Sequence, residues 1–282
     1  MTSRAIEDEQ IRVGHGTVEL AVSRWGDEGP AMVLLHPGVG DRRIWRWCAP
    51  AWAESGFRVV AHDRRGFGDT VYDPSVHDDV DDRAAVMDAA SATPAIVVGN
   101  SRGGELAVEF ARRHPERVAA LVLIAPFLHG YDLASWEACD AEEALDDRIA
   151  AASETGDLDE VNRLELHYWL DGVEQPEGRV QGEARTLMAD MNGRALRAPS
   201  PGDTPDRPDL WAGAAELDHP TLVVVGDLDL PGLRRLAREL ATSMRHARFA
   251  EIAGAAHCPS LDQPDALTAL VASFARDVGL AG

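Results

Sequence analysis

Six short apolar runs recur along the chain, and helical stretches separate most of them. The runs are Ala31 to Leu35, Phe57 to Ala61, Ala95 to Gly99, Ala119 to Ala125, Thr221 to Gly226 and Arg248 to Ile252. Continuous runs of this length between turns are typical of strands that are buried on both faces. Their alternation with helices predicts a mainly parallel sheet with helices on both sides, joined by right-handed crossovers. The expected fold class is therefore α/β.

The two ends of this pattern also have clear local signals. Ile11 to Gly14 and Val18 to Val22 flank the turn residues His15 and Gly16, which predicts an opening β-hairpin. Near the other end, apolar residues recur at steps of three and four, which predicts a helix that packs one face on the sheet: Leu267, Leu270, Val271, Phe274 and Val278.

One long stretch, residues 127–209, interrupts the alternation because it contains no strand-like run. Its segments Trp136 to Ala152 and Leu158 to Leu170 are acidic and rich in helix-forming residues. It closes with a run of Pro, Gly and Asp from Ala198 to Asp209, which is typical of a linker. We therefore predict one core domain, residues 1–126 and 210–282, with a helical insertion at 127–209.

Composition excludes several classes of partner. Lys and Arg number 27 against 48 Asp and Glu, so the net charge of −21 repels polyanions, and we expect neither nucleic acid nor an anionic membrane surface as a partner. No window approaches 18 apolar residues, and the first ten residues lack the features of a signal peptide. These observations predict a soluble cytoplasmic protein. They leave its oligomeric state open.

Metal ions and disulfides are not expected. The three cysteines, Cys48, Cys139 and Cys258, have no paired spacing, which argues against a disulfide framework and against zinc. The acidic run from His77 to Asp82 lacks the glycine and the spaced ligands of a calcium-binding EF-hand loop. Acidic residues are in any case favourable at the start of a helix.

A serine lies between a predicted strand and a predicted helix. The sequence Gly99-Asn100-Ser101-Arg102-Gly103 follows the strand directly, and an apolar helical stretch begins at once after it. A serine at such a sharp turn takes a strained backbone conformation that lifts its hydroxyl clear of the sheet, and the glycines allow strand and helix to pass closely. No Gly-Lys-Ser/Thr ending supports a phosphate-binding loop. Ser101 is therefore the predicted nucleophile.

A serine hydroxyl becomes a good nucleophile only when a positioned base takes its proton. Of the ten histidines, His257 lies in the loop between the last predicted strand and the last predicted helix. The carboxyl ends of strands are where active sites of such sheets are found. We therefore predict His257 as the base.

The histidine needs a carboxylate that fixes its tautomer and stabilises its positive form. Asp227 and Asp229 both follow the strand that ends at Gly226, and periodicity does not separate them. Asp229 lies further from the strand and is better placed to reach a neighbouring loop. We take Asp229 as the acid and leave Asp227 open as the alternative, with a structural role in the turn otherwise.

Ser101, Asp229 and His257 follow one another in the chain order of α/β-hydrolases, and the sequence resembles that superfamily over nearly its whole length. The resemblance is carried by short motifs in a common order: His36-Pro37-Gly38, Asp63 to Gly68, Gly99 to Gly103, Gly226 to Asp229, and His257. It implies a mostly parallel, eight-stranded sheet flanked by helices, with residues 127–209 forming a helical cap over the site. In this family the acid commonly lies three residues after such a glycine, which again favours Asp229.

Acyl transfer also needs N–H donors aimed at the developing oxyanion. The amide of Arg102, directly after the nucleophile, is one predicted donor. The resemblance places the second in the loop that begins at His36, where Pro37 departs from the common His-Gly pattern and has no N–H. We predict the amide of Gly38, with Val39 as the alternative.

The predicted function is hydrolysis of a small or medium carboxylic ester, lactone or related acyl compound through an acyl-enzyme, with no cofactor. The resemblance leaves open a carbon–carbon bond hydrolase, a lyase or a perhydrolase with the same triad, and a binding protein without turnover. Serine rather than aspartate at position 101 disfavours an epoxide or haloalkane hydrolase. The substrate is expected to be a small molecule that the sequence does not name.

Several further residues have two interpretations. Four cap residues either line an apolar cleft or hold the small core of the cap together: Trp136, His167, Tyr168 and Trp169. The side chain of Arg102 either meets a substrate carboxylate or, as we expect, pairs with Glu105. Cys258 is expected to pack rather than to act as a nucleophile.

Overall fold

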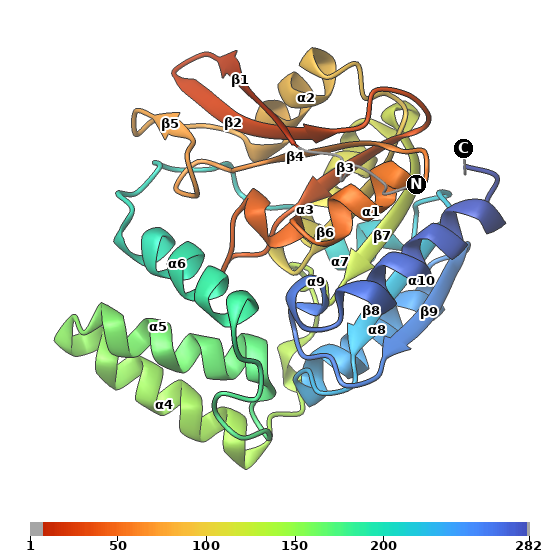
Figure 1. Ribbon diagram of the computed structural model, residues 1–282. Helices are drawn as coiled ribbons and strands as arrows, with labels where there is room; N and C mark the ends of the chain where they lie inside the picture. The colour runs from red at the N-terminus through yellow and green to blue at the C-terminus, as the bar shows by residue number, and fades with distance from the viewer. Residues whose placement is uncertain (1–7, 281–282) are drawn as a thin grey trace, which may run out of the picture.

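The computed structural model describes residues 8–280 and is built on one sheet with helices against both of its faces (Figure 1). Among the described residues, eight strands follow one another in the order β1-β2-β4-β3-β6-β7-β8-β9, and a ninth, β5, pairs with β2. The strands are β1 (Glu9–His15), β2 (Val18–Trp25), β3 (Ala31–Leu35), β4 (Arg58–His62), β5 (Val71–Tyr72), β6 (Ala95–Asn100), β7 (Val118–Ile124), β8 (Thr221–Gly226) and β9 (Ala247–Ile252).

The sheet is mainly parallel, as predicted. All pairs from β4 through β3 to β9 are parallel, and only β2 pairs antiparallel, with β1, β4 and β5. The predicted hairpin is present, with His15 opposite Val18 and a turn in which Gly16 takes a φ of +58°. That left-handed conformation costs glycine little because it has no Cβ. The short strand β5 was not predicted, since two residues give no periodicity.

The central strands are buried on both faces, which explains their continuous apolar sequences. In β3, Val33 and Leu35 pack into a core beneath α2 (Asp79–Ala89), α3 (Arg102–Arg113), α7 (Leu210–Ala214) and α8 (Pro231–Ser243). Met32 and Leu34 point to the opposite core, beneath α1 (Cys48–Glu54), α9 (Pro259–Asp262) and α10 (Pro264–Asp277). Successive side chains of a strand point to opposite faces, so both cores need apolar residues.

Residues between β7 and α7 form a group of helices at one end of the molecule, drawn in green in Figure 1. They are the short 3-10 helix η3 (Leu133–Ser135), α4 (Asp140–Thr155), α5 (Leu158–Leu166), the π-helical turn η4 (His167–Gly172) and α6 (Glu183–Arg197). As expected, the described stretch 127–209 contains no strand. The exact bounds of the core and of the insertion remain a prediction.

Two predicted helices differ in their bounds. The helix expected from Trp136 begins only at Asp140, because the backbone is extended at Trp136 (ψ 128°) and at Cys139 (ψ 159°). The Trp136 ring packs against Gly232 of α8, and its Nε1–H donates to Glu142 (2.9 Å). The helix expected over 158–170 ends at Leu166 and widens into η4. Such π-helical turns inside helices are rare and occur often at functional sites.

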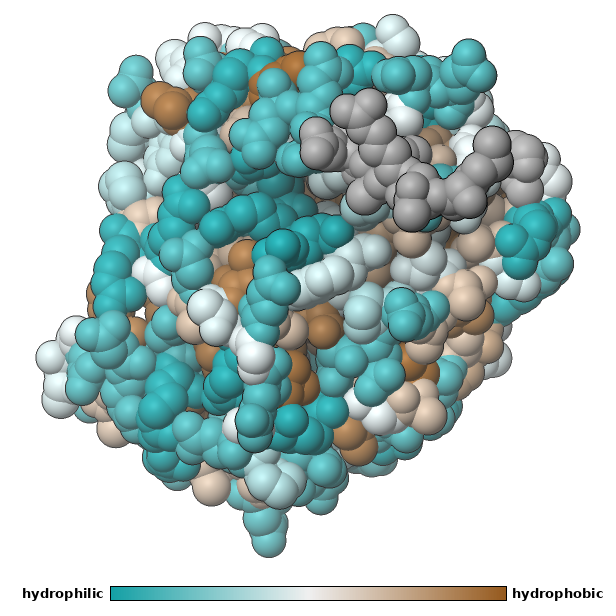
Figure 2. Space-filling view, viewed as in Figure 1, coloured by the Kyte–Doolittle hydropathy of each residue, from teal (hydrophilic) through white to brown (hydrophobic). Residues whose placement is uncertain are grey.

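On the face shown in Figure 2, hydrophilic residues cover most of the surface, and hydrophobic residues show between them in patches. None of the described helices combines the length and the apolar character that crossing a bilayer requires.

The buried histidine at the end of β4 gives a testable pH dependence. His62 is 2% exposed, and burial, together with the positive charges of Arg83 and Arg64, lowers the pKa of its imidazole to about 3. In the unfolded chain a histidine has a pKa of about 6.5. The unfolded state therefore binds the extra proton between these values, so the free energy of unfolding falls as the pH drops from 6.5 toward 3.

We predict that His62→Gln weakens this acid sensitivity. Replacing one such group removes roughly 1.4 kcal/mol of pH dependence for each pH unit within that window. Urea unfolding at pH 7 and pH 5 measures the change for wild type and variant. The exposed His246 gives the control His246→Gln, which keeps the wild-type dependence. Equal pH dependence in His62→Gln and wild type would contradict the prediction.

Candidate active site

Ser101 is the single residue between β6 and α3. Its backbone takes φ +54° and ψ −118°, a conformation that costs free energy in a residue with a side chain. Hydrogen bonds hold it there: Ser101 N–H donates to Ile124 O (2.8 Å), and its carbonyl accepts from the N–H of Gly104 (2.8 Å). The sharp strand-to-helix turn predicted for the nucleophile is present.

The glycines on either side of the serine are required by packing. A Cβ atom on Gly99 would collide with the carbonyl oxygen of Gly103, and a Cβ on Gly103 would collide with that of Leu35. Strand β6, helix α3 and the end of β3 therefore approach one another without intervening side chains. This contact places the loop after Leu35 beside the first turn of α3.

The predicted base and acid are in contact. His257 Nδ1 lies 3.0 Å from Asp229 Oδ2, and the two residues are only 2% and 6% exposed. The second oxygen of Asp229 accepts the N–H of Leu230 (2.8 Å). Asp227, the alternative acid, instead accepts the N–H of Gly254 (2.6 Å) and so closes the turn between the two loops. Asp229, and not Asp227, therefore has the geometry of the orienting carboxylate.

Asn100 connects the serine to the histidine loop. Its Nδ2 donates to the carbonyl oxygens of His257 (3.2 Å) and Ile124 (3.2 Å), so the residue before Ser101 is hydrogen-bonded to the histidine. Ser101 Oγ makes no hydrogen bond among the described residues. Catalytic hydrogen bonds are often long without substrate and tighten when it binds. The three predicted triad residues thus share one end of the sheet.

The loop proposed for the oxyanion site is fixed by a neutral histidine. Arg64 N–H donates to His36 Nε2 (3.1 Å), which leaves Nδ1–H to donate to Pro37 O (2.8 Å). Burial and the positive charge of Arg64 lower the pKa of His36, so it accepts at Nε2 without being protonated. A Cβ on Gly38 would meet nothing within 4 Å, which shows that this residue faces open space.

Three backbone N–H groups in this region have no acceptor within residues 8–280. Arg102 is the first residue of α3, and the first N–H groups of a helix have no acceptor within it. Within residues 8–280, neither Gly38 nor Val39 donates its N–H to the protein, so both remain candidates for the second donor. The Arg102 side chain pairs with Glu105, as expected, and also with Asp79 (3.3 Å). Its charge is therefore already balanced.

Of the four cap residues singled out in the sequence, one contacts the predicted triad. The centroid of the Trp169 ring lies 4.5 Å from that of His257. Tyr168 and Trp136 pack in the small core of the cap, and His167 Nε2 is bonded to Gln175 O (2.8 Å).

Sequence reasoning missed three residues that hold the histidine loop: Asn100, Arg179 and Asp262. Asn100 lies within the motif, but its neighbours in sequence do not show where its amide points. Arg179 and Asp262 meet across 83 positions, and no local pattern marks either of them.

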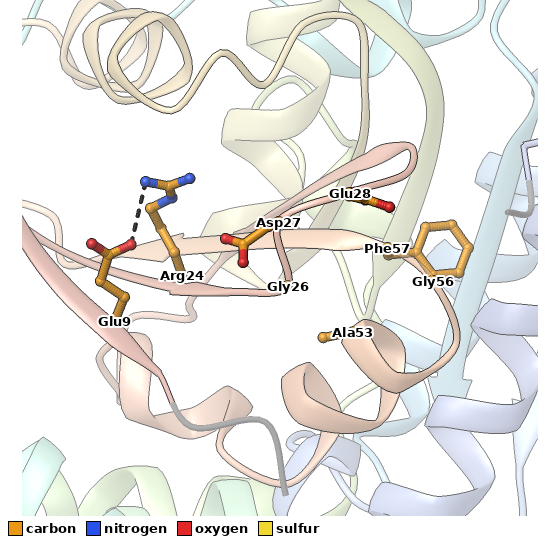
Figure 3. A pocket seen from close by; sticks show the side chains of 8 residues that line it. All are labelled: Glu9, Arg24, Gly26, Asp27, Glu28, Ala53, Gly56 and Phe57. Atoms are coloured by element: carbon orange, nitrogen blue, oxygen red, sulfur yellow. Dashed lines mark ion pairs between the residues drawn. The ribbon is translucent and has the colours of Figure 1, made fainter. Parts of the chain in front are cut away.

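Two other features do not belong to the triad. A pocket of about 780 Å³, shown in Figure 3, is lined by residues such as Arg24, Glu28 and Phe57 and by none of the triad residues. Cys258, next to the histidine, is fully buried, and burial raises the pKa of its thiol, so it stays protonated. It packs, as predicted.

Comparison with known proteins matches residues 32–270 to the model of the alpha/beta hydrolase family. Epoxide hydrolase B of Mycobacterium tuberculosis is 40% identical over 106 residues, which are 36% of this chain and only 30% of that protein. The 2-hydroxymuconate semialdehyde hydrolase of a Pseudomonas strain is 28% identical, over 90% of this chain and 89% of its own length.

Among solved structures, an esterase from Thermogutta terrifontis superposes with a TM-score of 0.70. It is 24% identical, and the match covers 96% of this chain and 99% of that one. The family match extends over most of the sequence and the architecture agrees with it, so the chain belongs to the alpha/beta hydrolase family and has the α/β-hydrolase fold.

Proposed function

We propose that this hydrolase cleaves a small or medium carboxylic ester, lactone or related acyl compound through an acyl-enzyme on Ser101. The observation that carries the proposal is the buried hydrogen bond between His257 and Asp229, at the end of the sheet where the strained serine lies. A buried carboxylate that holds a histidine by Nδ1 leaves Nε2 free to accept the proton of a serine.

In the first half of the reaction, His257 takes the proton of Ser101 while Oγ attacks the substrate carbonyl carbon. The electron pair of the carbonyl moves to its oxygen, and the N–H groups of Arg102 and of Gly38 or Val39 stabilise that oxyanion. When the tetrahedral intermediate collapses, the bond to the leaving oxygen breaks. His257 gives its proton to the leaving alcohol, and the acyl group remains on Ser101.

In the second half, water attacks the acyl carbon and gives a proton to His257. Collapse of this second intermediate releases the carboxylic acid, and the proton returns to Ser101. Asp229 stays ionised throughout, keeps the Nδ1–H tautomer and stabilises the positive imidazolium in both halves.

A second candidate is cleavage of a carbon–carbon bond by the same triad. It is favoured by the similarity to the 2-hydroxymuconate semialdehyde hydrolase, which extends over most of both chains. The local similarity to an epoxide hydrolase is a weaker guide, because it covers 30% of that protein and this chain has serine at the nucleophile position. Turnover of a simple ester that depends on Ser101 supports the first candidate.

We predict that a fluorophosphonate probe forms one adduct on the wild-type protein and none on Ser101→Ala. Such probes react with serines that a neighbouring base activates, so His257→Ala also loses the adduct. Intact-mass spectrometry measures the adduct, and circular dichroism shows that each variant is folded. An adduct that persists on Ser101→Ala would overturn the assignment of the nucleophile.

The two aspartates provide a matched pair of variants. We predict that Asp229→Asn slows labelling by about 10³-fold or more, because asparagine donates to Nδ1 and so favours the wrong tautomer. Asp227→Asn keeps an oxygen that accepts the Gly254 N–H and stays within about tenfold of wild type. The second-order rate of probe labelling measures both. A greater loss in Asp227→Asn would reverse the assignment of the acid.

A further inference from the structure

Asp229 holds the imidazole of His257 at one point only. A hydrogen bond to Nδ1 fixes one atom, and the side-chain torsion next to the ring of a histidine has a broad energy minimum. The ring can therefore swing about that bond unless something also contacts its face. For general-base catalysis, Nε2 must point at Ser101 within a narrow range of angles.

The cap supplies that contact. The indole of Trp169 lies against the imidazole with a centroid separation of 4.5 Å and an angle of 45° between the planes. Trp169 is partly buried and is packed against both the core of the α/β domain and that of the cap. Aromatic rings at such separations attract one another and exclude water from the surface they share.

The turn that carries Trp169 is hydrogen-bonded to the loop that carries His257. Arg179 donates to the carbonyl oxygens of the next two residues, Leu170 (2.9 Å) and Asp171 (2.7 Å). The same guanidinium donates to Gly254 O (3.0 Å) and to both carboxylate oxygens of Asp262 (3.1 and 2.5 Å). One side chain therefore joins the turn that carries Trp169 to the loop that carries His257.

These hydrogen bonds extend to the residue before the histidine. Asp262 Oδ2 also accepts the N–H of Ala256 (2.8 Å), so the carboxylate that binds Arg179 also holds the backbone next to His257. On the acid side, Gly172 has a φ of +92°, and a Cβ there would lie 2.6 Å from Leu228 O. The η4 turn thus contacts the loops of both the base and the acid.

From these contacts we propose that Trp169 is a positioning residue for His257. It keeps the imidazole in the orientation that presents Nε2 to Ser101, and Arg179 with Asp262 keeps Trp169 in place. The inference rests on the proposed function, because it assigns a role only if His257 acts as the base of Ser101. The cap therefore helps to position the triad as well as covering it.

The test compares Trp169→Leu and Trp169→Phe in labelling by a fluorophosphonate, measured as a function of probe concentration. Leucine leaves the imidazole face uncovered, and we expect the saturating rate to fall at least about tenfold, while the half-saturating concentration changes less than about threefold. Phenylalanine still presents a ring, and we expect it to restore the rate to within about threefold of wild type. A merely structural role would not separate the two parameters in this way.

Trp136→Leu is the matched control, because Trp136 also packs in the core of the cap, but its ring pairs with that of Phe127 and not with the imidazole of His257. We expect its labelling rate to stay within about threefold of wild type. If Trp169→Leu does not fold, Arg179→Gln tests the proposal instead. This variant keeps the indole but removes the hydrogen bonds that hold the turn carrying it. We expect that variant to label at least about threefold more slowly than wild type.

The outcomes separate this inference from the proposed function. A wild-type protein that does not label at Ser101 overturns both. A wild type that labels, together with a folded Trp169→Leu that labels equally fast, overturns the positioning role alone. The same holds if Trp136→Leu loses as much as Trp169→Leu, or if Arg179→Gln labels at the wild-type rate.

Discussion

No side chain can be accommodated where β6, α3 and the end of β3 meet, and the geometry of the site depends on that closeness. Gly99 and Gly103 allow the helix to start against the strand, and the serine between them takes its strained conformation as a result. The same contact brings the loop after Leu35 beside the free N–H groups of α3. The proposed nucleophile and the proposed oxyanion donors are thus placed by one packing constraint.

Three carboxylates hold the loops that carry Asp229 and His257. Asp229 contacts the histidine, Asp227 ties its own loop to Gly254, and Asp262 holds the backbone before His257 while it binds Arg179. Each of the three carboxylates accepts a hydrogen bond from a neighbouring backbone N–H group. A strongly acidic chain therefore builds a site in which the carboxylates have defined partners, and the imidazole is positioned before any substrate arrives.

Local patterns predicted much of the core, and the reason is physical. Strands such as β3 and β8 are buried on both faces, so their bounds coincide with their apolar runs, Ala31–Leu35 and Thr221–Gly226. Ser101 and His257 were predicted from their positions at strand ends. Asp229 needed an argument about reach, which the structure supports. Trp169 was left with two interpretations and Arg179 was not singled out, since their contacts depend on how a distant helical segment docks, and no periodicity records that.

The strained backbone of Ser101 also affects which residue selection for thermal stability would favour at this position. A residue held at φ +54° and ψ −118° costs the folded state about 1–3 kcal/mol, and glycine would relieve most of that cost. With Ser101 as the proposed nucleophile, thermal stability and turnover oppose each other at this one position. Laboratory evolution that rewards survival at high temperature alone would enrich chains that have lost the hydroxyl, and only a simultaneous demand for activity would retain the serine.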